Sequence, residues 1–291
     1  MEVLPLHPHG YCVGVRQAIS TALEAKKNYP DRNVYLLGLL VHNEETMKDL
    51  SNAGLIPLDE HEKSILEHIL DRKKGDVVVF SAHGHPEAYE ELAKEKGLIV
   101  IDATCRYVTE NLLAAKEESS PILYVGVEGH LESEAFLANC PEATFYDVKT
   151  GHAEFMHLLA QGGNPTIITQ TTLSSLEVES ALKDIRTLFP HATLSKERCH
   201  STSLRQKAIL DLPEDVDAVI VLGSKRSNNS LKLAELAKSK GKKAYLCLGL
   251  EDVKALPLGK ERRLALCSGA STSDATFDAV LSYLRSVSSS C

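Results

Sequence analysis

The sequence predicts an α/β protein built from small parallel sheets with helices on both faces. Short continuous runs of Val, Ile and Leu recur along the 291 residues, and amphipathic stretches separate them. Such runs, without alternation of apolar and polar residues, are typical of strands buried on both faces of a parallel sheet. Parallel strands need a crossover connection, which is usually a helix, so both observations indicate the same fold class.

Eight segments fit the strands of this fold. In chain order they are NVYLLG at 33–38, DVVVFS at 76–81, LIVID at 98–102, PILYVG at 121–126, PTIITQ at 165–170, DAVIVLG at 217–223, KAYLCLG at 243–249 and RLALCSG at 263–269. Residues 42–54 and 227–241 fit helices between strands, and the second begins with polar capping residues and closes on Gly241.

The composition is that of a soluble globular protein, with 43% hydrophobic and 25% charged residues. The formal net charge of −8 argues against nucleic-acid binding, and tryptophan is absent. No apolar run approaches the roughly 20 residues that cross a bilayer, and the N-terminal residues do not resemble a signal peptide. We therefore expect a cytoplasmic protein with neither nucleic acid nor membrane as partner, whose seven cysteines stay reduced.

Three of the cysteines recur in one context. Cys12, Cys105 and Cys199 are 93 and 94 residues apart, and each precedes a helical pattern. A thiol near a helix N-terminus is favoured as thiolate by the helix dipole. The apolar stripes after the first two include Val15, Ala18, Ile19, Ala22 and Leu23, then Val108, Leu112 and Ala115, whereas the third, Leu204 and Ala208, is weaker.

The spacing suggests three similar α/β lobes, at residues 1–98, 99–193 and 194–291, each contributing one thiolate to a shared centre. Three thiolates could hold zinc or a [4Fe–4S] cluster with one iron lacking a protein ligand. No C-x2-C pair is present, which favours the cluster. Cys247 and Cys267 lie in apolar strands and are interpreted as core residues, while Cys140 and Cys291 are interpreted as incidental.

Polar segments follow the predicted strands. They are VHNEE at 41–45, SAHGHP at 81–86, VEGHLESEA at 127–135, QTTLS at 170–174, SKRSNNS at 224–230 and SGASTSD at 268–274. Ligands of parallel α/β sheets bind beyond the carboxyl ends of the strands, and helix N-termini there suit phosphate. Taken singly, each segment is a helix cap or turn; six of matching composition indicate a site.

Together with GYCVGV and DATC, these segments resemble the 4-hydroxy-3-methylbut-2-enyl diphosphate reductase family in order and approximate spacing, from Cys12 to about Asp274. The resemblance implies three lobes in a pseudo-threefold arrangement around a [4Fe–4S] cluster with an open iron. It implies reductive dehydroxylation to isopentenyl and dimethylallyl diphosphate, the last step of the methylerythritol phosphate pathway. Reduced ferredoxin or flavodoxin would supply the electrons.

The resemblance also implies a role for each matching residue. Cys12, Cys105 and Cys199 match the cluster ligands, and Glu132 matches the acid that delivers a proton, with His130 beside it and Thr171 orienting it. Matching the residues that bind the diphosphate and the substrate are His42, His83, His130, Thr171, Ser227, Asn228, Asn229 and Ser271.

The chain departs from the family pattern at Tyr11, at Arg106 and Tyr107, and at Asn228, which replaces a common serine. None of these departures touches a predicted ligand or the acid. Two alternatives stay open: a cluster-containing lyase that needs no external electrons, and a non-catalytic zinc or iron–sulfur protein.

Overall fold

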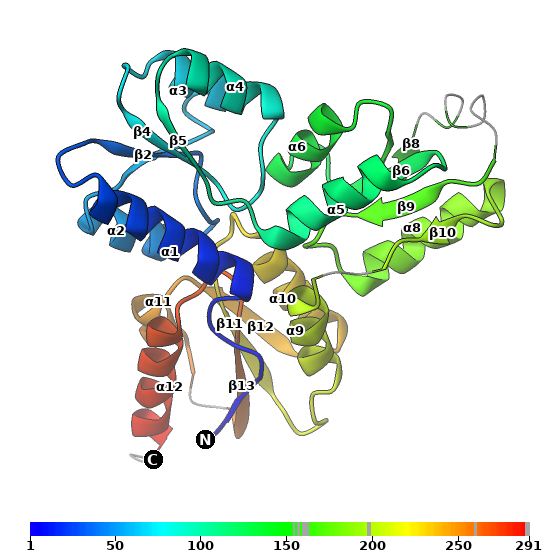
Figure 1. The fold of residues 1–291 in the computed structure, drawn as a ribbon. Coiled ribbons are helices and arrows are strands. Elements are labelled where there is room, and N and C mark those ends of the chain that lie inside the picture. The colour runs from blue at the N-terminus through cyan, green and yellow to red at the C-terminus, as the bar shows by residue number, and fades with distance from the viewer. Residues whose placement is uncertain (154, 156–157, 159–162, 197–198, 259–260, 289–291) are drawn as a thin grey trace. The chain divides into compact units, whose positions relative to one another are not determined.

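The structure is a computed structural model that describes residues 1–153, 155, 158, 163–196, 199–258 and 261–288 (Figure 1). These residues form two compact units. One comprises Met1–Arg16, Val41–Asp49 and His200–Cys291, and the other Gln17–Leu40 and Leu50–Cys199. No helix within the described ranges is long and apolar enough to cross a membrane.

The first unit contains one parallel sheet of four strands. The strand order is β1 (Glu2–Pro5), β13 (Arg263–Ser268), β11 (Ala218–Leu222) and β12 (Lys243–Cys247). Every residue of β11 is buried. Val219 and Val221 pack with Leu233, whereas Ile220 and Leu222 pack with Phe277. This alternation means that the sheet is covered on both faces.

The helices of this unit supply those two faces. Figure 1 shows α12 (Asp274–Ser288) on one side of the sheet and α9 (Ser201–Leu210) with α10 (Asn228–Ser239) on the other. A short helix, α11 (Leu250–Lys254), packs with α12.

The second unit contains two further sheets. The first has the order β3 (Ile56–Leu58), β2 (Val34–Leu37), β4 (Val77–Phe80) and β5 (Ile99–Asp102), with all strands parallel. The second has the order β10 (Thr193–Leu194), β9 (Thr166–Thr169), β6 (Ile122–Gly126), β7 (Thr144–Asp147) and β8 (His152–Ala153). Only β8 among these described strands runs antiparallel to its neighbour.

Helices connect the strands of this unit. Leu37, Val78 and Phe80 of the first sheet pack with Ile69 and Ala93, which lie in α3 (Ile65–Leu70) and α4 (Glu87–Glu95). The second sheet packs against α8 (Ser175–Leu188) on one face and against α5 (Arg106–Glu117) and α6 (Leu131–Asn139) on the other.

The predicted class is confirmed: three small, mainly parallel sheets with helices, and all eight expected strands are present. The expected helices are α2 (Glu44–Asn52) and α10. Sheet membership crosses the lobe boundaries expected from the sequence. β1 pairs with β13, β5 pairs with β4, and Leu194 of β10 pairs with Ile167, because strand pairing rather than chain position defines each sheet.

The helical stripes after the cysteines are confirmed only in part. In α1 (Val13–Asn28), Ala18 and Ala22 are fully buried, but Leu23 is 41% exposed. The stripe predicted for α9 is wrong at Leu204, which is 51% exposed. The buried face of α9 is largely polar and consists of Thr202, Arg205, Gln206 and Ile209. This face makes hydrogen bonds as well as apolar contacts, so apolar spacing could not locate it.

Candidate active site

A buried carboxyl group lies at the start of α6. Glu132 is 3% exposed, and both of its oxygens accept hydrogen bonds from Thr171, which follows β9. The Thr171 N–H donates to Oε1 at 2.7 Å and its hydroxyl donates to Oε2 at 2.8 Å. Burial raises the pKa of Glu132 from 4.5 to about 7, against the opposing effect of the two Thr171 hydrogen bonds. The geometry therefore gives an oriented carboxyl group that can hold a proton near neutral pH.

Two histidines accompany this carboxyl. His130 caps α6, since its Nδ1 accepts the Glu132 N–H at 3.1 Å. An accepting Nδ1 fixes the proton of the neutral ring on Nε2, which is thereby a donor. The ring of His83 meets that of His130 edge-on at 5.8 Å between centroids. The Ser81 hydroxyl lies 3.2 Å from His83 Nδ1 and orients this second ring.

The side chain of Gln170, which the sequence analysis did not single out, connects the loop after β6 to the loop after β9. Gln170 is 1% exposed. Its Oε1 accepts the Val127 N–H at 2.9 Å and the Ser133 hydroxyl at 3.3 Å, while its Nε2 donates to the Thr172 hydroxyl at 2.7 Å. The side chain thus joins the segment before His130 to the segment of Thr171. Its position within QTTLS is the only sequence signal for this role.

The raised pKa of Glu132 predicts a pH dependence of stability. The folded chain keeps this proton up to about pH 7, whereas the unfolded chain releases it near 4.5. The folded state then binds more protons within this window, so the free energy of unfolding falls as the pH rises through it. Relative to Glu132→Gln, we expect a decrease on the order of 3 kcal/mol. Anaerobic urea denaturation at a series of pH values measures it, and parallel curves for the two proteins would contradict the raised pKa.

In the first unit, polar groups gather at the N-terminus of α10. Ser227 is the N-cap, and its hydroxyl oxygen accepts the Ser230 N–H at 3.3 Å. Asn229 is 4% exposed, yet neither Nδ2 nor Oδ1 has a hydrogen-bond partner among the described residues. Nδ2 of the half-buried Asn228 likewise has none there. Buried amides are nearly always paired, so this arrangement fits a bound polar ligand.

Two glycines let α10 approach the strand ends closely. A Cβ at Gly223 or at Gly269 would lie 2.1 Å from the hydroxyl oxygen of Ser230. These glycines directly follow β11 and β13, respectively, so the first turn of α10 lies against the carboxyl ends of both strands. This is the location where phosphate groups bind in parallel α/β sheets.

His42 and Ser271 belong to the same unit. The Ser271 hydroxyl donates to the His42 carbonyl at 3.4 Å, and the Thr46 hydroxyl donates to the Ser271 carbonyl at 3.0 Å. The loop after β13 and the start of α2 (Glu44–Asn52) are therefore linked to each other.

The cysteines fall into two classes. Cys12, Cys105 and Cys199 are partly exposed, and none of the six described cysteines forms a disulfide. The Val15 N–H points to Cys12 Sγ at 3.4 Å, and Cys105 is the N-cap residue of α5. Cys199 precedes Ser201, the first residue of α9.

The other described cysteines are buried thiols. Burial raises the pKa of Cys247 to about 11 and that of Cys267 to about 12, which confirms that both are core residues. Cys140 also belongs to an apolar cluster, and its pKa is raised to about 12 for the same reason, so it is a core residue as well. Cys291 lies outside the described residues.

The predicted site residues are divided between the two units. The first unit holds Cys12, His42, Ser227, Asn228, Asn229 and Ser271. The second holds His83, Cys105, His130, Glu132, Thr171 and Cys199.

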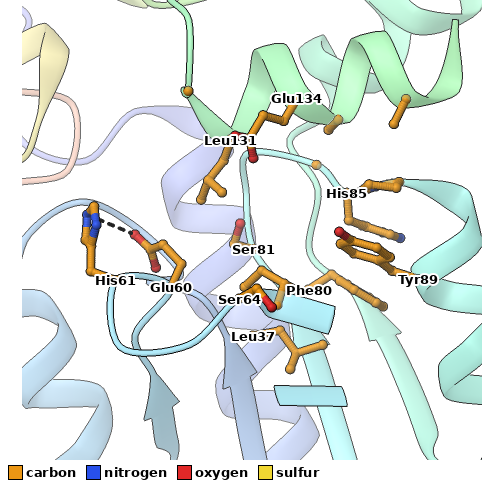
Figure 2. A pocket seen from close by; sticks show the side chains of 16 residues that line it. Leu37, Glu60, His61, Ser64, Phe80, Ser81, His85, Tyr89, Leu131 and Glu134 are labelled. Atoms are coloured by element: carbon orange, nitrogen blue, oxygen red, sulfur yellow. Dashed lines mark ion pairs between the residues drawn. The ribbon is translucent and has the colours of Figure 1, made fainter. Parts of the chain in front are cut away.

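A cavity of about 570 Å³ lies in the second unit, beside His83 and His130 (Figure 2). Its walls include Ser81, the neighbour of His83, and both Gly129 and Leu131 beside His130. The lining carries the carboxylates of Glu60 and Glu134 and the imidazoles of His61 and His85, but no lysine or arginine.

Tyr11, Arg106 and Tyr107, which depart from the family pattern, each form a side-chain hydrogen bond within the chain. The Tyr11 hydroxyl lies 3.1 Å from that of Thr46, and burial raises its pKa. The guanidinium of Arg106 donates to the Tyr107 hydroxyl at 2.7 Å on the exposed start of α5. Neither hydrogen bond involves Glu132 or Thr171.

Known proteins match nearly the whole chain. The family model described as LytB protein matches residues 3–285. The chain is 35% identical over 291 residues to the 4-hydroxy-3-methylbut-2-enyl diphosphate reductase of Shouchella clausii, covering 98% of this chain and 91% of the relative. It is 32% identical over 281 residues to the protein of that name from Malacoplasma penetrans, covering 94% and 93%.

Two solved structures have the same fold. The E-1-hydroxy-2-methyl-but-2-enyl-4-diphosphate reductase from Plasmodium falciparum matches with a TM-score of 0.84 and 26% identity, over 97% of this chain and 87% of that one. A second structure, of (E)-4-hydroxy-3-methyl-but-2-enyl diphosphate reductase, described as the terminal enzyme of the non-mevalonate pathway, matches with a TM-score of 0.68 and 26% identity, over 98% and 100%. The chain therefore belongs to the LytB family.

Proposed function

We propose that this protein is a 4-hydroxy-3-methylbut-2-enyl diphosphate reductase, which forms isopentenyl and dimethylallyl diphosphate in the last step of the methylerythritol phosphate pathway. Its family membership supports this activity. The single observation in the structure that carries the chemistry is the buried Glu132 carboxyl held at both oxygens by Thr171. A reductive dehydroxylation needs such an acid beside the leaving oxygen.

The described thiols fit an iron–sulfur cluster. Cys12, Cys105 and Cys199 are the partly exposed cysteines and lie at or just before helix N-termini, whereas the remaining described cysteines are buried in apolar clusters. Helix dipoles favour thiolates at such positions. These three residues would hold the cluster, which supplies the two electrons and an open Lewis-acidic iron position for the substrate oxygen. Reduced ferredoxin or flavodoxin is the proposed donor, and a cytoplasmic location stays a prediction.

The protein groups have separable tasks in this proposal. His42, Ser227, Asn228, Asn229 and Ser271 bind the diphosphate, together with His83 and His130. Thr171 orients both Glu132 and the substrate hydroxyl. Glu132 delivers the proton with which that oxygen leaves as water, while two electrons and a second proton remain with the allylic carbon skeleton.

The activity is tested with the anaerobically purified protein, a viologen reduced by dithionite and the allylic diphosphate. Reductant-dependent formation of both five-carbon diphosphates, followed by mass spectrometry, is expected. Conversion without reductant would indicate a lyase, and a cluster-loaded protein that forms no product would contradict the proposal.

The unpaired Asn229 amide predicts a binding defect upon substitution. In Asn229→Asp, a carboxylate faces the diphosphate, and loss of a hydrogen bond to a charged group with added repulsion should raise KM by roughly 10- to 100-fold. Steady-state kinetics measure this effect. The matched control is Asn33→Asp, which adds the same charge at an exposed side chain that donates to the Tyr35 hydroxyl. Equal KM values for the two variants would exclude Asn229 from the diphosphate site.

A further inference from the structure

A buried guanidinium lies on the polar face of α9. Arg205 is 3% exposed and belongs to the helix whose first residue, Ser201, follows Cys199 by two positions. Burying a cation costs several kcal/mol unless the surrounding groups compensate it. A chain that needed only packing at this position would carry an apolar residue there. The buried charge of Arg205 therefore indicates that this residue does more than fill space.

The contacts of Arg205 join three separate segments. Its Nη2 donates to the Gly10 carbonyl at 2.6 Å, and its Nε donates to the Ser268 carbonyl at 3.2 Å. Its Nη1 donates to the Ser201 carbonyl at 3.1 Å and to the Ser201 hydroxyl at 2.5 Å. The planar fork of a guanidinium can satisfy all these oxygens at once, which the single ammonium of a lysine cannot.

The segments held in this way carry predicted site residues. Gly10 precedes Cys12 by two residues and has a φ of +72°, so its backbone conformation is one that few other residues adopt. The Gly10 N–H donates to the Ser268 hydroxyl at 3.0 Å, and the Cys12 N–H donates to the Ala270 carbonyl at 3.0 Å. Ser271 follows in the same loop. Arg205, Gly10 and Ser268 are thus linked to one another by hydrogen bonds, and the backbone of Cys12 is bonded to the same loop through Ala270.

The charge of Arg205 has a second consequence. A cluster bound by three thiolates becomes more negative upon one-electron reduction, and buried positive charge in its surroundings stabilises the reduced form. Since the guanidinium stays protonated at all relevant pH values, this contribution is permanent.

We propose that Arg205 is a positioning residue that pre-organises the Cys12 loop and the start of α9 for the cluster and raises the cluster's reduction potential. This inference rests on the proposed function, because it presumes that Cys12 and Cys199 bind the cluster.

The test compares the wild type with Arg205→Met, Arg205→Lys and a control, Arg263→Met. Arg263 lies in the same unit, and its guanidinium pairs with Asp215 and Glu2 at the start of β13. The control therefore removes an equal charge away from the Gly10–Ser268–Ser201 contacts. Two readouts are independent of turnover: iron and sulfide retained after anaerobic reconstitution and desalting, and the midpoint potential from a redox titration monitored by electron paramagnetic resonance.

We expect Arg205→Met to lose the cluster roughly 10- to 100-fold faster than the wild type. The clusters that remain should titrate at a more negative potential. Arg205→Lys should also lose the cluster faster, but its potential should stay near that of the wild type because the charge remains. Arg263→Met should match the wild type in both readouts.

Cluster retention and potentials in the Arg205 variants equal to those of Arg263→Met would overturn the inference. If Arg205→Met does not fold, Arg205→Lys decides alone: faster cluster loss than in Arg263→Met supports the positioning role, and equal retention refutes it. A wild type that binds no iron–sulfur cluster would instead refute the proposed function, so the two failures are distinguishable.

Discussion

Glu132→Gln is expected to lower kcat by about 10²- to 10⁴-fold while the cluster content stays at the wild-type level. The amide keeps the size of the carboxyl and can still accept the Thr171 N–H bond, but it has no proton to deliver. Single-turnover reduction of the allylic diphosphate, with iron determined on the same sample, measures both quantities.

Glu179→Gln is the matched control, because Glu179 is an exposed carboxylate of α8 in the same unit and lies outside the lining of the cavity. It should retain wild-type turnover. A Glu132→Gln protein that reduces the substrate at the wild-type rate would remove this residue from the chemistry. It would also favour a binding or sensing protein, for which the carboxyl is dispensable.

The second large effect is expected when a predicted cluster-ligating cysteine is replaced. Replacing Cys12, Cys105 or Cys199 singly by serine should abolish the stable [4Fe–4S] cluster, since a shared centre with three ligands loses one third of its protein attachment. Iron and sulfide analysis together with the visible absorption of the anaerobic protein measures the loss.

Cys247→Ser and Cys267→Ser are the controls for this series. Both thiols lie in apolar clusters and are 2% and 3% exposed. A hydroxyl buried there without a partner should cost about 1–3 kcal/mol of stability but leave the cluster in place. Equal cluster loss in all five variants would contradict the assignment of the ligands.

Much of the fold could be predicted from the sequence, because central strands in small parallel sheets are continuous apolar runs. β4 and β11 are buried at every residue, and their sequences, VVVF and AVIVL, fit few structures other than a buried strand. The missed strands are β1, β3, β7, β8 and β10, of which β7 lies between β6 and β8 and the other four lie at sheet edges. They have two to four residues, and β3 contains Pro57. Short edge strands are defined by pairing with a neighbour rather than by an apolar run.

For the candidate site, the sequence reveals the segments that contribute residues but not the contacts between them. Strand-end segments such as GHLE and QTTLS could be found because helix caps and hydroxyl groups concentrate there. The sequence does not show that Thr171 bonds both oxygens of Glu132, since 39 residues separate the two in the chain.

Arg205 illustrates the same limit more strongly. Its partner Gly10 lies 195 residues away, and the polar buried face of α9 has no apolar period to reveal it. The roles of Arg205 and Gln170 emerge only from the folded chain, because both act by holding backbone segments that are distant in sequence.

The central claim is that Cys12, Cys105 and Cys199 hold a cluster whose open iron receives the substrate. Iron and sulfide analysis of the anaerobic protein, combined with Mössbauer spectra with and without the allylic diphosphate, tests it most directly. We predict about four irons per chain, one of which changes its environment when the diphosphate is added. Bound zinc, or a cluster whose spectrum is the same in both samples, would contradict the claim.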